Sequence, residues 1–233
     1  MRTSIINCLE VDLDGDVWVG TSEGPVIFEC GNNPFDTDFC NGSLRQLEQD
    51  GFGANLLVTE NIQSIAIDGA NRKWIGTNNG LFIQSPDGRE QIAFFNTENS
   101  PLFDNTIIDI AINPENGEAF IGTNNGVISL RGDATEGQPI NSADVYAFPN
   151  PVRPEYNGPI AIKGLATDAN VKITDVSGQL IFETTALGGQ AIWDGRDFSG
   201  RKASTGVYLV FSTSRTRGLS SPNTAVAKIL FIN

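Results

Sequence analysis

The first 143 residues contain one sequence pattern three times, and this internal repeat limits the fold more than any other feature of the chain. The three copies read CLEVDLDGDVWVGTSEGPVIF, SIAIDGANRKWIGTNNGLFI and DIAINPENGEAFIGTNNGVISL. In each copy an aromatic residue, Trp18, Trp74 or Phe120, comes two positions before a glycine. Successive aromatic residues lie 56 and 46 positions apart. These spacings are close to the length of one propeller blade, so the repeat predicts three stacked sheets.

Each copy predicts the same order of elements. An apolar strand, residues 5–11 in the first copy, is followed by a polar turn and by an aromatic-led strand that ends in Gly-Thr. A glycine turn and a third strand come next, and a fourth strand near residues 92–95 completes the second copy. The third copy ends after residues 127–130 without a fourth strand. Three blades are too few to close a ring, since propellers have roughly 4–8.

The aromatic residue of each copy has a structural interpretation. A large ring at one position per blade fills the wedge between neighbouring blades. We therefore expect Trp18, Trp74 and Phe120 to be blade-packing residues rather than ligand contacts.

The Trp-Ile-Gly-Thr-x-x-Gly core of these copies resembles the two-component-regulator type of β-propeller repeat. The resemblance implies an incomplete propeller over residues 1–130. The segment that follows, RGDATEGQPINSAD (131–144), is polar and rich in turn residues, which predicts a linker.

Residues 145–233 form a different pattern. They open with VYAFPNPV, continue through VKITDVSGQLIFE and WDGRDFSGRKASTGVYLVF, and end with AVAKILFIN. Short strands with turn residues between them account for the pattern. The blocks resemble the C-terminal sorting domain of the type IX secretion system, which implies an immunoglobulin-like sandwich that is read as an export signal. The positions that match this motif are Pro149, Asn150, Pro151, Gly178, Gly200, Gly206 and Lys228.

These observations together predict an all-β chain, with a partial propeller of about three blades followed by an immunoglobulin-like β-sandwich. The 25 glycines and 11 prolines agree with this class, and no long segment keeps a helical apolar period. No apolar run is long enough to span a membrane as a helix. The N-terminal residues MRTSIINCLEVDLDG lack the apolar region of a signal peptide. Together with the resemblance to an exported family, this predicts the C-terminal part of a longer protein whose signal peptide lies upstream.

Charge is divided unevenly along the chain. Residues 1–143 carry 6 Lys and Arg against 21 Asp and Glu, whereas residues 144–233 carry 9 against 7. An acidic first part argues against nucleic-acid binding, because phosphates require basic surfaces. The cationic residues available for an anionic ligand therefore lie mainly in the second part, and they are Lys163, Lys172, Arg196, Arg201, Lys202, Arg215 and Arg217.

Enzymatic activity, cofactors and metals are not expected. The chain has no histidine, which removes Ser-His-Asp and Cys-His catalysis and histidine-bound zinc. Asp12, Asp14 and Asp16 are interpreted as a hairpin turn, with a calcium loop as the alternative, because the other two copies lose the carboxylates. The aspartates around 194–197 have the same two interpretations. Cys30 and Cys40 flank a loop that a disulfide would close in an oxidising compartment, and Cys8 lies in a predicted strand.

Propeller repeats followed directly by a sorting domain resemble a family of surface components of the type IX secretion system. The resemblance implies a non-enzymatic protein on the extracellular side of the outer membrane, with the type IX translocon and sortase as partners. It also implies that the protein binds anionic lipopolysaccharide and delivers it to the sortase. The alternatives are secreted type IX cargo with a carbohydrate-binding or adhesive propeller, and part of a periplasmic propeller that senses oligosaccharides.

Overall fold

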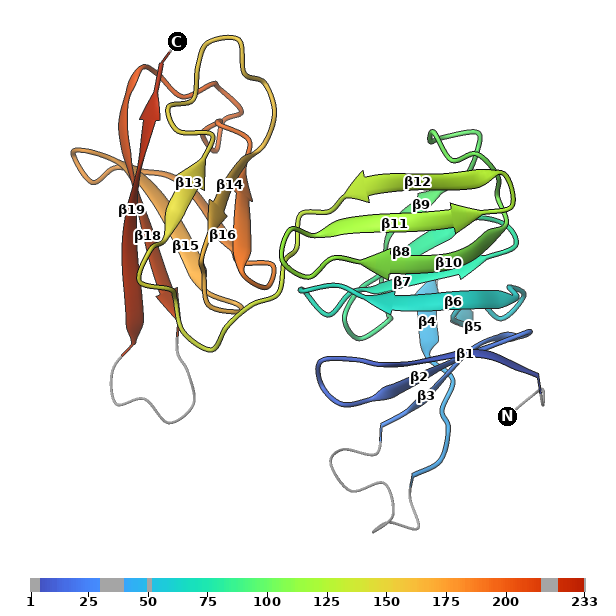
Figure 1. Ribbon diagram of the computed structural model, residues 1–233. Coiled ribbons are helices and arrows are strands. Elements are labelled where there is room, and N and C mark those ends of the chain that lie inside the picture. Colours follow the sequence, from blue (N-terminus) through green and yellow to red (C-terminus); the bar gives the residue numbers. More distant parts are fainter. Residues whose placement is uncertain (1–4, 30–39, 50–51, 215–221, 233) are drawn as a thin grey trace. The chain divides into compact units, whose positions relative to one another are not determined.

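The computed structural model describes residues 5–29, 40–49, 52–214 and 222–232, and every regular element in these ranges is a β-strand (Figure 1). The chain divides into two compact units, residues 1–132 and residues 133–233. The predicted fold class, blade-like sheets followed by a sandwich, is confirmed.

Three antiparallel sheets of the first unit correspond to the three sequence copies. Their strands are β1 (Ile6–Val11), β2 (Val17–Thr21) and β3 (Gly24–Phe28); β6 (Ile62–Ile67), β7 (Lys73–Thr77), β8 (Leu81–Gln84) and β9 (Gln91–Phe95); and β10 (Ile107–Ile112), β11 (Glu118–Thr123) and β12 (Gly126–Arg131). A hairpin of β4 (Gln46–Gln49) and β5 (Phe52–Asn55) lies between the first two sheets in the chain. The middle sheet is the central blade, since β6 contacts both β1 and β10 (Figure 1). β9 is the expected fourth strand, and among the described strands β12 pairs only with β11.

The Gly-Thr-x-x-Gly part of each copy is a turn that the threonine side chain closes. Thr21 Oγ1 donates a hydrogen bond to the carbonyl of Gly24 at 2.6 Å, and the hydroxyls of Thr77 and Thr123 make the equivalent bond at 3.1 and 2.8 Å. The N–H group two residues after each threonine donates back to the same hydroxyl. The closing glycine has a positive φ in all three turns, which a residue with a Cβ rarely adopts. One short motif therefore specifies the same hairpin three times.

In the first two blades, the glycine before the threonine leaves room for a side chain of the next blade. A Cβ on Gly20 would lie 2.7 Å from Cγ2 of Ile62, and a Cβ on Gly76 would lie 2.6 Å from Cγ2 of Ile107. Both isoleucines are completely buried. Each joint between neighbouring blades therefore includes an isoleucine that begins one inner strand and a glycine that receives it.

We expect Gly76→Ala to lower the free energy of unfolding by about 1–3 kcal/mol, because the added methyl group overlaps Ile107. The matched control is Gly122→Ala in the third blade, where the closest atom to a new Cβ is a backbone oxygen at 3.5 Å. Its effect should stay within about 0.5 kcal/mol. Urea unfolding followed by circular dichroism measures both values. Equal losses for the two variants would contradict the isoleucine–glycine joint.

The second unit is a sandwich of two antiparallel sheets. The three-stranded sheet has the order β13 (Tyr146–Phe148), β14 (Ile160–Lys163), β17 (Gln190–Trp193), and the four-stranded sheet has the order β16 (Leu180–Thr185), β15 (Asn170–Asp175), β18 (Gly206–Ser214), β19 (Asn223–Phe231). At the core, the ring of Trp193 lies 5.5 Å from that of Tyr208 and 5.8 Å from that of Phe231, measured between centroids. Trp193 is completely buried, and its Nε1 donates to the carbonyl of Arg196. Its place at the centre of the core depends on contacts with β18 and β19.

The segment that the sequence predicts as a linker, 131–144, contributes to the second unit from residue 133 onward. Ala134 and Asn141 are only 2% and 7% exposed. The Oδ1 atom of Asn141 accepts hydrogen bonds from the N–H group of Ala166 and from the hydroxyl of Ser212. Polar residues in this segment are buried because their partners come from strands and loops distant in the sequence.

Candidate functional site

The Pro-Asn-Pro segment at the entry of the second unit pairs with the last strand. Asn150 Nδ2 donates to the carbonyl of Lys228 at 2.8 Å, and Asn150 Oδ1 accepts from the N–H group of Leu230 at 3.0 Å. Pro149 and Pro151 have no N–H group to donate, and both follow cis peptide bonds. The amide side chain of Asn150 therefore makes the two hydrogen bonds to the backbone of β19 that a neighbouring strand would otherwise make. The structure thus brings together two of the predicted motif positions, Asn150 and Lys228, that lie 78 residues apart.

Two further motif glycines belong to turns with one shared sequence, Asp-x-Ser-Gly. Gly178 and Gly200 have positive φ angles of 89° and 78°, and a Cβ at either would meet no atom within 4 Å. The carboxylate of Asp197 accepts bonds from the hydroxyl of Ser199 and from Arg201, and these bonds lower its pKa to about 2 despite partial desolvation. These turns are explained by local hydrogen bonding. Gly206 begins β18 in an ordinary backbone conformation.

Two of the seven predicted cationic residues share a pocket. Arg196 and Lys202 pair across a hairpin and line a cavity of about 110 Å³ in the second unit. Tyr156, Asn157 and Asp194 lie in the same lining. Arg196, Lys202 and Asn157, which line this cavity, are residue types that donate hydrogen bonds to phosphate or carboxylate groups. The Asp194 carboxylate, 4.0 Å from Nε of Arg196, limits how much negative charge the cavity accepts.

The other predicted cationic residues that the structure describes do not line this pocket, and two of them form ion pairs with carboxylates. Lys163 is half-buried in β14, and Lys172 in β15 forms an ion pair with Glu183 at 3.6 Å. Arg201 is held by Asp197 at 3.0 Å. Arg215 and Arg217 lie outside the described residues. Arg196 and Lys202 also have partners, since Arg196 Nη1 donates to the carbonyl of Gly200 at 2.8 Å and Lys202 Nζ to that of Pro154 at 3.3 Å. Among the described candidates, they are distinguished by lining one common pocket.

In the first unit, Asp12 faces the interior. Its Oδ2 accepts from Trp18 Nε1 at 3.0 Å and lies 2.9 Å from Lys73 Nζ. Lys73 is completely buried, and its ammonium group lies 5.0 Å from the centroid of the Trp18 ring. Burial by itself would raise the pKa of Asp12, but the bond from Lys73 and the N–H group of Asp16 outweigh it and lower the pKa. Burial lowers the pKa of Lys73, and Asp12 opposes that change.

The second blade repeats this arrangement. Asp68 Oδ2 accepts from Trp74 Nε1 at 2.9 Å and from Arg72 Nε at 2.6 Å. In both blades the aspartate six positions before the tryptophan binds the indole N–H group. The contacts fit the turn interpretation of the aspartates rather than the calcium alternative. Within the described ranges, no group of three or more potential metal-binding side chains is assembled.

The three blade-packing candidates differ in burial. Trp18 and Trp74 are 1% and 2% exposed, as expected for residues between blades. Phe120 is 44% exposed, because no described sheet covers that face of the third blade. Of the three predicted blade-packing residues, Trp18 and Trp74 are therefore buried and Phe120 is not.

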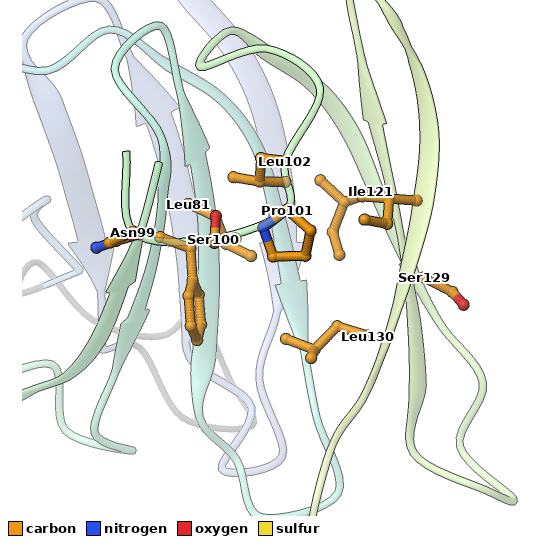
Figure 2. Close-up of a pocket in the computed structure, with 10 residues that line it drawn as sticks. Leu81, Asn99, Ser100, Pro101, Leu102, Ile121, Ser129 and Leu130 are labelled. Atoms are coloured by element: carbon orange, nitrogen blue, oxygen red, sulfur yellow. The ribbon is translucent and has the colours of Figure 1, made fainter. Parts of the chain in front are cut away.

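An apolar pocket of about 150 Å³ opens between the second and third blades. Figure 2 shows Pro101 and Leu102, from the loop after β9, beside Ile121 and Leu130 of the third blade. Asn99, Ser100 and Ser129 supply the polar groups at its border. The pocket suits an apolar group, and it has none of the cations that an anionic glycan requires.

Two of the three cysteines, Cys8 and Cys40, are among the described residues. Cys40 is disulfide-bonded, Cys8 is a half-buried free thiol, and Cys30 lies outside the described residues. Burial raises the pKa of the Cys8 thiol.

Over the described ranges there is no helix of the length and apolarity that a membrane crossing needs.

The chain is similar to the solved structure of PorZ, described as an essential bacterial surface component of the type-IX secretion system of Porphyromonas gingivalis. The identity is 28%, the TM-score is 0.61, and the match covers 97% of this chain but only 30% of that one. Two extracellular domains from B. thetaiotaomicron, described as belonging to a hybrid two component system and a one component system, match at 16% identity with TM-scores of 0.40 and 0.38. They cover 98% and 97% of this chain and 32% and 31% of their own. No protein-family model and no curated protein matches the sequence.

Proposed function

We propose that this chain is part of a non-enzymatic surface component of the type IX secretion system, which binds anionic lipopolysaccharide and delivers it to the sortase machinery. In this proposal residues 145–233 act as the export signal, and the protein works on the extracellular side of the outer membrane. The observation that carries the proposal is the similarity to PorZ over 97% of the chain. The chain spans only 30% of the length of that protein.

The Arg196–Lys202 pocket supports the choice of an anionic ligand. It lies in the less acidic part of the chain and places two cationic side chains around one cavity. A phosphate group held by both would gain charge-assisted hydrogen bonds, each contributing about 1.5–3 kcal/mol. The Asp12–Lys73 and Asp68–Arg72 pairs of the first unit are buried, so they do not serve this role.

The binding test reverses both charges in the full-length protein, Arg196→Glu with Lys202→Glu. Binding of purified lipopolysaccharide should weaken by at least about tenfold, because two favourable contacts become repulsive. The matched control is Lys172→Glu, an exposed lysine on β15 outside the pocket. Circular dichroism checks that all variants fold. Unchanged binding in the double variant, or an equal loss in the control, would remove this pocket from the proposal.

A second experiment addresses the export role. An antibody against residues 145–233 is used on the native host, with cell-surface labelling and intact-mass measurement. A surface protein that still carries the epitope is the expected result. A mature form without the epitope would instead indicate cargo whose terminal domain is removed, and it would contradict the proposed role as a retained component.

A further inference from the structure

β19 is an edge strand of the four-stranded sheet in the second unit, and it pairs with β18 without a break in register (Figure 1). The edge that faces away from β18 is occupied toward the end of the strand. There the carbonyl of Lys228 and the N–H group of Leu230 bond to the side chain of Asn150, and the carbonyl of Leu230 accepts from the N–H group of Val152. Because backbone groups alternate in direction along an antiparallel strand, the even-numbered residues of β19 present their N–H and C=O groups to this edge.

The first part of the same edge is unoccupied. By the alternation, Thr224 and Val226 also present their N–H and C=O groups away from β18. Within the described ranges, these four groups make no hydrogen bond. Both side chains are exposed, that of Val226 at 57%. An edge of this kind is a template for pairing with another strand.

The two edges of the sheet differ in how they are protected. Proteins protect edge strands with charged residues, prolines or bulges. The other edge strand, β16, carries the charged Glu183 and has a register shift in its pairing with β15. The unoccupied part of β19 consists of Thr224, Ala225 and Val226, which are uncharged, and its pairing with β18 is regular. Strand addition is therefore favoured at β19 over β16.

The unoccupied groups of β19 are complementary to themselves. When a second β19 lies antiparallel with its Ala225 opposite Ala225, Thr224 of each copy lies opposite Val226 of the other. These are hydrogen-bonded pairs, so all four groups of each copy find a partner. The next pair places Lys228 opposite Pro222. Proline has no N–H group to donate, and the carbonyl of Lys228 already accepts from Asn150, so this pair leaves no group unsatisfied.

We propose that the unoccupied edge of β19 pairs with β19 of a second copy of this chain, which joins two four-stranded sheets into one continuous antiparallel sheet. The match of Pro222 to Lys228 selects a second copy as the occupant. Charge does not oppose it, since residues 144–233 carry 9 Lys and Arg against 7 Asp and Glu. The proposal is independent of lipopolysaccharide binding, and either can fail without the other.

The first test is sedimentation equilibrium of the full chain from low to high micromolar concentration. We expect a monomer–dimer equilibrium that Thr224→Pro weakens by at least about tenfold, because each copy loses one hydrogen bond between strands while the ladder to β18 keeps its own. The matched control is Thr185→Pro, an exposed threonine of β16. Its N–H group also faces away from the sheet, since that of the next residue, Ala186, bonds to Ala169 beside β15. The control should leave the dimer unchanged.

A second variant covers the case in which a proline disturbs folding, which circular dichroism detects. Val226→Lys keeps every backbone group and adds a charge to each copy at the centre of the interface, so it should also weaken the dimer. A chain that stays monomeric at all concentrations, or a dimer that neither Thr224→Pro nor Val226→Lys weakens, would overturn the proposal. An equal loss with Thr185→Pro would overturn it as well.

The register is tested by cross-linking. Ala225→Cys places the two new thiols in a non-hydrogen-bonded pair with Cα atoms about 4.5 Å apart, which a disulfide spans. The matched control is Val226→Cys, whose two thiols lie diagonally across the interface with Cα atoms more than about 7 Å apart. Both variants keep the three native cysteines, and the control position is the more exposed. After oxidation with oxidised glutathione, non-reducing electrophoresis should show a covalent dimer for Ala225→Cys and much less for Val226→Cys. Equal yields, or a higher yield for the control, would contradict the proposed pairing.

Discussion

Replacing Asp12 by alanine is expected to lower the free energy of unfolding of the first unit by about 3–5 kcal/mol. The substitution leaves the ammonium group of Lys73 buried without its carboxylate, and it removes the partner of the Trp18 indole N–H group. Urea unfolding followed by tryptophan fluorescence measures the loss. The control is Glu115→Ala, which removes one negative charge from the exposed turn of the third blade and should change stability by less than about 0.5 kcal/mol.

The double variant Asp12→Leu with Lys73→Met should be more stable than Asp12→Ala, because replacing a buried pair by apolar residues avoids the unpaired charge. A double variant as unstable as the single one would contradict this explanation.

The pH dependence of the stability that Asp12 contributes has a defined direction. The pKa of Asp12 is lower in the folded protein, so its contribution is complete above the ordinary value of 3.8 and is lost as the pH falls below it.

Replacing Trp193 by alanine is expected to destabilise the second unit by about 3–5 kcal/mol. The ring is completely buried between Tyr208 and Phe231, so its removal leaves a cavity at the centre of the sandwich. Hydrogen exchange with peptide-level resolution should show faster exchange in residues 145–232 and unchanged exchange in the first unit, which is a separate compact unit. The control is Phe198→Ala, an aromatic truncation at a position that is 66% exposed.

A Trp193→Ala protein with the same stability as the Phe198→Ala protein would mean that the sandwich core does not depend on this ring. Faster exchange over residues 5–132 as well would mean that the two units unfold together. Either result would contradict the expected effect, and the two are distinguished in the same exchange experiment.

The local turns of this protein could be predicted from its sequence because their causes lie within a few residues. The Gly-Thr-x-x-Gly turn needs only a threonine hydroxyl and a glycine with positive φ, and both occur in every copy. The Asp-x-Ser-Gly turns of the second unit depend on one aspartate that accepts bonds within the following four residues. The order of the strands and the all-β class follow from the same local patterns.

The tertiary structure alone decided how the candidate residues are used, because their partners are distant in the sequence. Asp12 lies in a sequence typical of a surface turn, yet an ion pair with Lys73 of the next blade holds its side chain in the interior. Asn150 lies in a sequence typical of a turn, yet its side chain hydrogen-bonds to the backbone of β19, 78 residues away. Phe120 carries the same signal as Trp18 and Trp74, but its burial depends on a neighbouring blade. Sequence alone determined which elements form, and the contacts between blades and sheets determined which of their side chains are buried, paired or left exposed.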